Sequence, residues 1–232
     1  MVRIGIVILC FWTSLFGAGP MTHLYLAEEF CNALRYGEEE TKQFLIGTSL
    51  PDIRYLTHCP RENTHFPVTS LKEVIECPSP FLAGMKFHAW VDEEREAFVI
   101  ASGIYKKIAP YVNVKKETFL KFLEEEIIDY DGRKWGDLFG APIKEEEAYA
   151  HYEQIAKWHF FVWGSMQARP SWLLWGASWI RREVFGISNQ IVYLWSYHFA
   201  TLAKEPEFRG YVDDLLTHLL QKIETASLNG GT

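Results

Sequence analysis

Apolar residues recur at the period of an α-helix along nearly the whole chain, and this feature constrains the fold most strongly. In residues 22–35, for example, one helical face carries Leu26, Ala27, Phe30, Ala33 and Leu34. No stretch of useful length alternates apolar and polar residues as a β-strand does, and no strand–helix–strand rhythm appears. We therefore predict an all-α protein, built as a multi-helix bundle.

Glycine, proline and clusters of polar residues predict where the helices begin and end. We expect a helix over 38–46 to stop at Gly47, and an ordered loop over 49–70, where three prolines occur. Further helices are predicted over 80–107, 115–130, 145–166, 169–186 (starting at Ser171), 191–203 and 207–224. No internal repeat or linker divides the chain, so we predict one all-α domain over residues 20–226.

The composition is that of a globular protein with a sizeable core and an acidic charge balance. Of the 232 residues, 48% are hydrophobic and 16% are aromatic, which argues against disorder. Lys and Arg number 23 against 30 Asp and Glu, a formal net charge of -7. Because duplex nucleic acid is bound largely through clusters of basic residues, this balance argues against a duplex-binding protein.

Residues 1–19 have the layout of a secretory signal peptide. Arg3 is followed by a nearly unbroken apolar run over 4–16 and by small residues at 17–19. The run is too short to cross a bilayer comfortably as a helix. We expect an exported protein, secreted or periplasmic. The alternatives are an uncleaved segment that tethers the protein to a membrane, and a buried N-terminal helix.

The four cysteines contain no C-x-x-C pair, so a structural zinc knot is not expected. Cys59 and Cys77 both precede a proline in loop-like sequence, and export would allow them to form a disulfide. Free thiols in a packed interior are the alternative, and the sequence favours neither.

Tryptophan is concentrated in the second half of the chain, where six of the nine lie between Trp158 and Trp195. Trp172, Trp175 and Trp179 share one helical face. Aromatic stripes usually pack into a core, so we expect these side chains to be buried. The alternative is a face that contacts the membrane interface, because indole rings prefer the headgroup region.

Three histidines and two aspartates lie where their side chains can meet at the edge of the core. They are His23, Asp52, His65, His88 and Asp92. His88 and Asp92 are one helical turn apart, next to the apolar stripe that contains Phe87 and Val91. Imidazole and carboxylate are ligands of Zn²⁺, and a carboxylate can bridge two ions. The alternative is that each is an ordinary core residue and that His88 and Asp92 simply pair with each other.

The motifs that contain these residues are "GPMTHLYLAEEF", "GTSLPDIRY", "THF" and "FHAWVDEEREAF". In this order, over about residues 17–98, the chain resembles the bacterial zinc-dependent phospholipase C family. That family shares its helical fold and metal cluster with the single-strand-specific zinc nucleases of fungi and plants. The resemblance implies that Asp52, His65, His88 and Asp92 bind one zinc ion. It also implies that His23 binds a second ion, with Asp92 as the bridging ligand.

The chain departs from the family at a third zinc site. The family places a histidine shortly after H-x-x-x-D, and here Phe98 stands at that point. The family also has a later H-x-x-x-E or H-x-x-x-D, where this chain has Phe122 one turn before Glu126. Because phenylalanine binds no metal, the third site is expected to be absent, or rebuilt from the histidines further along the chain, and one or two zinc ions are expected. These histidines are His151, His159, His198 and His218.

The resemblance implies a zinc-dependent hydrolase of phosphoric esters, with a phospholipid or another small phosphodiester as substrate. Asp52 would orient or deprotonate the attacking water. Peripheral contact with a membrane fits a lipid substrate. One rival is a nuclease that acts on single strands, although the acidic charge counts against it. Others are a metal-stabilised helical binding protein without catalysis and a metal-free bundle.

In the resembled family the mature chain often begins shortly before the first histidine, and its free α-amino group and first carbonyl complete a zinc site. Ala18 stands five residues before His23, a suitable distance for this arrangement. Cleavage near Gly17 or Ala18 is therefore expected both to release the protein and to complete the second metal site. The family's tryptophan at this position is absent here, because Trp12 lies inside the apolar run.

Overall fold

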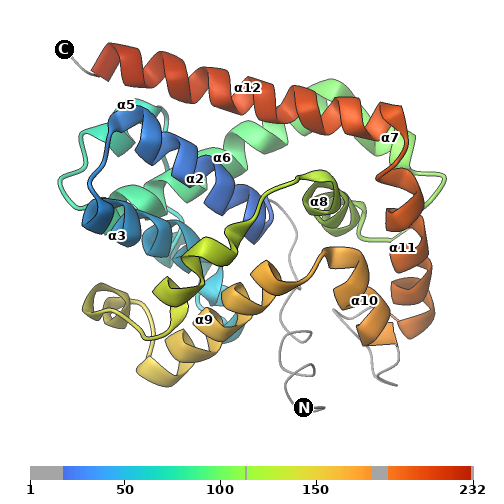
Figure 1. Ribbon diagram of the computed structural model, residues 1–232, viewed down its shortest axis with the longest axis horizontal. Helices are drawn as coiled ribbons and strands as arrows, with labels where there is room; N and C mark the ends of the chain where they lie inside the picture. Colours follow the sequence, from blue (N-terminus) through green and yellow to red (C-terminus); the bar gives the residue numbers. More distant parts are fainter. Residues whose placement is uncertain (1–17, 113, 179–187, 231–232) are drawn as a thin grey trace.

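The computed structural model describes residues 18–112, 114–178 and 188–230, and these residues are helical with connecting turns (Figure 1). No β-strand occurs among them, so the prediction of an all-α protein is confirmed. No described helix is long and apolar enough to cross a membrane. The predicted signal peptide lies almost entirely in residues 1–17, outside the described ranges.

The first half of the chain contributes α2 (Pro20–Leu34), α3 (Glu38–Ser49), the 3₁₀ helix η1 (Leu50–Ile53), α4 (Arg54–Thr57), η2 (Arg61–Asn63), α5 (Leu71–Ile75), α6 (Pro80–Ser102) and α7 (Ile104–Ile108). The second half contributes α8 (Lys116–Ile127), η3 (Gly132–Phe139), η4 (Lys144–Ala148), α9 (Tyr152–Gln167), α10 (Pro170–Ser178), α11 (Asn189–Leu202) and α12 (Pro206–Gly230). The predicted loop over 49–70 thus contains three short helices. Pro51 lies in the first turn of η1 and Pro60 at the N-cap of η2, positions where a helix accepts proline.

The closest packing in the first half is between α3 and α6, which cross at two glycines. A β-carbon on Gly47 would lie 2.0 Å from the carbonyl oxygen of Phe81, and one on Gly84 would lie 2.2 Å from that of Phe44. The prediction that Gly47 ends its helix is therefore wrong. Its missing side chain lets two helices approach, and α3 continues to Ser49.

Helix α6 carries two of the candidate ligands, and clear end signals delimit it. Ser79 caps its start, where the hydroxyl oxygen accepts from the backbone N–H of Leu82 at 3.3 Å, and Pro80 occupies the first turn. Gly103, with φ of 67°, ends it. The single helix predicted over 80–107 is therefore two helices, because the backbone turns at this glycine into α7.

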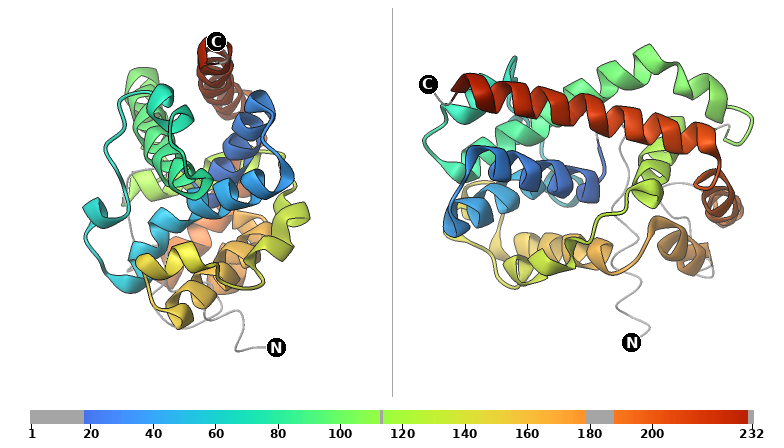
Figure 2. Two further views of the ribbon diagram at one scale, coloured as in Figure 1. Left: turned by 90° about the vertical axis from the view of Figure 1, so that its left-hand side faces the viewer. Right: turned by 45° about the horizontal axis from the view of Figure 1, so that its top comes forward.

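The long helix α12 closes one side of the molecule. It runs beside α2 and α6, as Figures 1 and 2 show, and it also contacts α5 and α8. It extends to Gly230, past the predicted end at 224, because no glycine or proline interrupts residues 211–229. The buried faces of α2, α3, α6 and α8 enclose a core rich in phenylalanine.

The tryptophans divide into two groups. Trp158 and Trp195 are buried, whereas Trp172 is 75% exposed and Trp175 is 55% exposed. The prediction of a buried stripe is therefore wrong for these two residues, and Trp179 lies outside the described residues. The physical reason is that α10 packs mainly on α8 and α11 and turns this face outward. Neighbouring α11 exposes further large apolar side chains, namely Tyr193, Leu194 and Tyr197.

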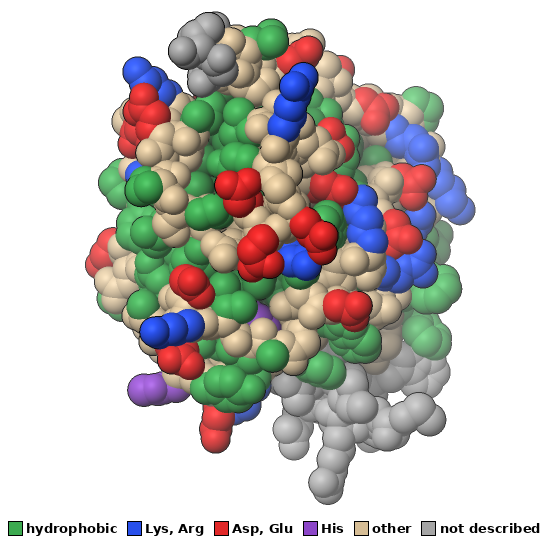
Figure 3. Space-filling model, turned by 60° about the vertical axis from the view of Figure 1, so that its left-hand side comes forward, with side chains coloured by type: hydrophobic (Ala, Val, Ile, Leu, Met, Phe, Trp, Pro, Cys, Tyr) green, Lys and Arg blue, Asp and Glu red, His purple; other side chains and the backbone are tan. Residues whose placement is uncertain are grey.

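Two further observations concern thiols and surface charge. Cys31, Cys59 and Cys77 are all free, so the alternative of a Cys59–Cys77 disulfide is not formed in the structure. On the face drawn in Figure 3, acidic and basic side chains are interspersed. Such a mixed face lacks the single sign of charge that binding to duplex nucleic acid requires.

Candidate metal centre

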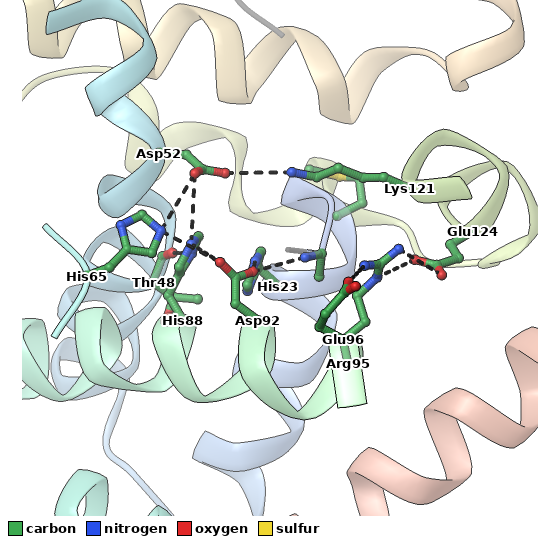
Figure 4. Close-up of polar contacts among 12 residues, drawn as sticks. His23, Thr48, Asp52, His65, His88, Asp92, Arg95, Glu96, Lys121 and Glu124 are labelled. Atoms are coloured by element: carbon green, nitrogen blue, oxygen red, sulfur yellow. Dashed lines mark hydrogen bonds and ion pairs between the residues drawn. The ribbon is translucent and has the colours of Figure 1, made fainter. Parts of the chain in front are cut away.

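The five side chains predicted as ligands meet in the interior, although they come from separate parts of the chain (Figure 4). His23 lies on α2, Asp52 on η1, His65 just after η2, and His88 and Asp92 on α6. All are buried except Asp52, which is partly exposed. We call these five residues the His/Asp cluster, and Asp52, His65, His88 and Asp92 within it the four-ligand set.

The imidazoles of His65 and His88 are both held with Nε2 directed into the four-ligand set. Nδ1 of His88 donates to the backbone carbonyl of Thr48 at 2.9 Å, since a carbonyl can only accept. The Thr64 hydroxyl donates to the carbonyl of Pro51 at 2.9 Å, so it accepts from Nδ1 of His65 at 3.0 Å. Both rings therefore carry a proton on Nδ1, and the Nε2 atom of each faces the carboxylates.

These two Nε2 atoms are buried and have no hydrogen-bond partner among the described residues. Each lies 3.6 Å from Oδ2 of Asp92, while Oδ1 of Asp52 is 3.8 Å from His65 and 4.0 Å from His88. These separations are too long for hydrogen bonds. Ligand atoms around a tetrahedral zinc ion lie about 3.4 Å apart when its bonds are about 2.0–2.2 Å. These four separations exceed the tetrahedral spacing by less than an ångström.

The other carboxylate oxygen of Asp92 belongs to a second possible ligand group. Oδ1 lies 3.2 Å from Nε2 of His23 and accepts from the backbone N–H of Ala18 at 3.0 Å. The rings of His23 and His88 stack with their centroids 3.8 Å apart. His23, His88 and Asp92 bring ligand atoms close enough to share an ion. Asp92 therefore lies between the two groups, as expected for a bridging carboxylate.

Three ionisable groups of the cluster, His88, Asp92 and Asp52, are in the forms that bind metal. Burial lowers the pKa of His88 far below its usual value, so its ring is neutral at pH 7. Burial acts to raise the pKa of Asp92, but the nearby imidazoles of His88 and His23 outweigh it and hold that pKa well below its usual range. Burial likewise opposes ionisation of Asp52, but Lys121 and His88 keep its pKa low. Neutral imidazole and ionised carboxylate are the ligand forms.

Two cations border the cluster, and the sequence patterns did not identify either. Nη2 of Arg61 donates to Oδ2 of Asp92 at 3.0 Å, and Nζ of Lys121 lies 3.8 Å from Oδ2 of Asp52. Arg61 belongs to η2, close to His65 in sequence, whereas Lys121 comes from α8. The spacing Lys121-x-x-x-Glu125 places both residues on one face of α8. This spacing is the one signal in the sequence that could have pointed to Lys121.

Glu125 anchors the start of α2 beside the cluster. Its Oε1 accepts from the backbone N–H of Met21 at 2.7 Å, and burial raises its pKa to about 7. A β-carbon on Gly19 would lie 2.0 Å from this oxygen, so a larger residue would force the Glu125 side chain to move. This contact holds the backbone that carries Ala18 and His23 against α8.

The residues considered for a third metal site lie elsewhere. Phe98 packs against the rings of Tyr211 and His218, and Phe122 packs against Phe199, as expected of residues that border no ion. Glu126 accepts hydrogen bonds from Ser171. Among the described residues, the later histidines stay outside the cluster. His151 is exposed, His159 pairs with Glu146, His198 contacts Tyr111, and His218 lies near Glu94.

No family model, no curated protein and no solved structure matches this chain. The resemblance to zinc-dependent phospholipases C therefore rests on the four short motifs quoted above. The geometry adds an independent fact, which is that three imidazoles and two carboxylates from distant segments form two adjoining groups, His23/His88/Asp92 and Asp52/His65/His88, each of which could hold a metal ion.

Proposed function

We propose that the protein is a zinc-dependent hydrolase of phosphoric esters, most closely a phosphodiesterase of the phospholipase C type. The observation that carries the proposal is the pair of buried Nε2 atoms on His65 and His88, which face two ionised carboxylates without hydrogen bonds among the described residues. A buried polar atom without a partner costs roughly 1–3 kcal/mol. A metal ion bound in the four-ligand set would remove this cost at both atoms.

The donor set favours zinc. Two imidazole nitrogens and two carboxylate oxygens are ligands typical of Zn²⁺, and the hydrogen bonds from Nδ1 to oxygen are the usual support of a ligating histidine. A zinc ion in such a site is a Lewis acid and lowers the pKa of a bound water from 15.7 to about 7. His23 and Asp92 offer a second position, so one or two ions are proposed.

The protein's own groups have distinct roles in this proposal. Asp52 is the partly exposed member of the cluster, so its carboxylate is placed to orient the attacking water and take its proton. Asp52, His65, His88 and Asp92 would hold one ion, and His23 together with Asp92 would hold the second. Lys121 and Arg61 bring positive charge to the side where negative charge develops on the phosphoryl oxygens.

Two features support a lipid substrate over a polynucleotide. Trp172 and Trp175 on α10 are exposed, as are Tyr193 and Tyr197 on α11, and such aromatic side chains favour the membrane interface. The net charge of -7 disfavours a polyanionic strand, although exposed rings can also stack on bases. We therefore propose a phospholipid headgroup as substrate, with peripheral membrane contact, and keep the single-strand nuclease as the rival.

Export and processing belong to the same proposal. The backbone nitrogen of Ala18 lies 3.0 Å from Oδ1 of Asp92, beside His23. If cleavage frees this nitrogen as an α-amino group, it becomes a further metal ligand, because a metal can displace the proton of an amine with a pKa near 7.7–8.0. Intact-mass measurement on protein from its native host tests this. A chain that still starts at Met1 and binds metal through His23 would remove this part.

Metal content is the first test. Protein purified without added chelator should contain at least one zinc per chain, and His88→Ala should lose it. His218→Ala is the matched control, because His218 lies outside the cluster and should leave the metal in place. Wild-type protein with no bound metal would eliminate the proposal.

Hydrolysis is the second test. A nitrophenyl phosphodiester and a phosphorylcholine ester should be cleaved at neutral pH, and chelation should stop the reaction. Asp52→Asn should reduce the rate by about 10²–10⁴-fold, as expected for loss of a general base, while Asp129→Asn on the exposed surface should not. Zinc-loaded protein inert on lipids, model diesters and single-stranded oligonucleotides would favour a non-catalytic, metal-stabilised binding protein.

A further inference from the structure

Two cationic side chains flank the four-ligand set, one beside each carboxylate. The Lys121 ammonium lies 3.8 Å from Oδ2 of Asp52, and the Arg61 guanidinium donates to Oδ2 of Asp92 at 3.0 Å. Only 9% of the Lys121 side chain is exposed, against 39% for Arg61. One cation is therefore part of the buried wall of the site, and the other lies toward solvent.

Neighbouring contacts fix the rotation of α8, and this keeps Lys121 on the side of the cluster. Glu124 accepts two hydrogen bonds from Arg95 of α6, at 2.7 and 3.0 Å. Glu125 accepts from the backbone N–H of Met21 at 2.7 Å. These contacts hold α8 in place, and Lys121 points from it toward Asp52 (Figure 4).

A divalent ion in the four-ligand set would change the balance of charge around these cations. The ion would cancel the two negative charges of Asp52 and Asp92. The positive charges of Lys121 and Arg61 would then be in excess, reduced by one when Glu125 is ionised. Excess charge in a largely buried site is costly unless a counter-charge accompanies it. The loaded site is therefore complementary to an anion with one or two negative charges.

We propose that Lys121 and Arg61 form an anion subsite that holds the phosphate group of the substrate beside the metal. The identification of the anion as a phosphate group rests on the proposed function. The two residues contribute differently. The guanidinium of Arg61 can bind two oxygens in a planar fork, and the ammonium of Lys121 acts as a compact point charge. A phosphodiester and the phosphate released from it share this chemistry, so both bind here.

The test is a titration of metal-loaded protein with inorganic phosphate by calorimetry, which requires no turnover. Lys121→Met removes the charge and keeps the length of the side chain, and Arg61→Met does the same at the exposed position. Each should weaken phosphate binding by about tenfold or more, as expected for loss of a charged hydrogen bond. Lys106→Met on the exposed side of α7 is the control and should bind phosphate as the wild type does. Metal content should be unchanged in all three.

Lys121→Arg covers the case in which the methionine variant does not fold. It keeps the charge and should bind phosphate within about threefold of wild type. A folded, metal-loaded Lys121→Met protein with wild-type affinity for phosphate would overturn the proposal, as would unchanged binding in Arg61→Met. If phosphate binding depends on both cations but no ester is cleaved, the subsite stands and the proposed hydrolase fails. If esters are cleaved with an unchanged KM in both variants, the hydrolase stands and the subsite fails.

Discussion

Helix α6 carries two groups of buried polar side chains about one turn apart, and the groups differ in how completely they are paired. Arg95 donates to both carboxylate oxygens of Glu124, and the Tyr211 hydroxyl donates to Oε1 of Glu124 at 2.8 Å. In the His/Asp cluster, by contrast, Nε2 of His65 and of His88 have no hydrogen-bond partner among the described residues. The polar atoms of the first group all find partners within the protein, whereas the second group has buried nitrogen atoms without a hydrogen-bond partner in the described part of the chain.

The difference distinguishes a structural joint from a binding site. The Arg95 group links α6, α8 and α12 and leaves no polar atom of Arg95 or Glu124 unsatisfied. Buried polar groups are paired in almost all folded proteins, so two atoms that lack partners among the described residues and face the same carboxylate make this group a candidate for binding a ligand. Burial and charge alone do not identify the metal site, because both groups have them. What sets the His/Asp cluster apart is that Nε2 of His65 and of His88 lack hydrogen-bond partners within the described ranges and face the same carboxylate of Asp92, in groups that could hold a metal ion.

The largest expected effect on stability concerns the buried group of Arg95 and Glu124. Arg95→Leu leaves the Glu124 carboxylate buried without its cation and should reduce the free energy of unfolding by about 3–5 kcal/mol. The measurement is urea-induced unfolding at pH 7 with zinc present. Metal content of the folded fraction should stay the same, since Arg95 touches none of the five ligands.

The double variant Arg95→Leu with Glu124→Leu sharpens this result. Removing both charges should recover part of the stability, because a buried ion pair is often replaceable by apolar residues. The Tyr211 hydroxyl then lacks its acceptor, so recovery should be incomplete. A double variant as unstable as the single one would show that packing volume, and not an unpaired charge, explains the loss.

The next effect concerns the incomplete group. Chelation should destabilise the wild type, because an ion that binds only the folded state stabilises it by about 2.7 kcal/mol at a hundred times its Kd. For a chain of this length that corresponds to a fall in Tm of roughly 5–10 °C. His88→Ala should start from a lower Tm and change little on chelation. Equal sensitivity to chelator in both proteins would place the stabilising ion outside the four-ligand set.

The sequence predicted those features of the fold and of the His/Asp cluster that depend on the spacing of residues within one helix or motif. Helical periodicity predicted the all-α fold, and the i, i+4 spacing of His88 and Asp92 placed both side chains on one side of a helix. The motif order identified His23, Asp52 and His65 as their companions. The structure brings all five together, although metal binding itself stays a prediction.

The sequence did not predict the features that depend on how the helices pack against one another. Helix α8 is buried nearly all round, so its apolar period does not show which face meets the cluster. The resembled family led us to examine Phe122 and Glu126, but the residues that face the cluster are Lys121 and Glu125. The two pairs differ by one position, which is a rotation of about 100° around the helix axis. The exposure of Trp172 likewise follows from the position of α10 at the edge of the bundle. Aromatic periodicity carries no information on that position.

The last prediction concerns Glu125, a buried carboxylate that has a hydrogen-bond partner but, among the described residues, no cation paired with it as closely as Arg95 is with Glu124. It accepts from the backbone N–H of Met21, and burial raises its pKa to about 7, above the usual 4.5. Between these two pH values the folded protein binds a proton that the unfolded chain has lost. The contribution of Glu125 to stability is therefore full below pH 4.5 and is lost as pH rises through 7, by up to about 1.4 kcal/mol per pH unit.

Glu125→Gln isolates this contribution, since glutamine keeps the acceptor for Met21 and has no charge to bury. Unfolding of the two proteins at pH 5, 6, 7 and 8 should show the variant gaining on the wild type as pH rises. Comparing the two proteins at each pH cancels the titration of the other buried groups, including His88. A difference that stays constant from pH 5 to pH 8 would mean that Glu125 is ionised throughout. It would then be paired as fully as Glu124, and the contrast on which the metal assignment rests would weaken.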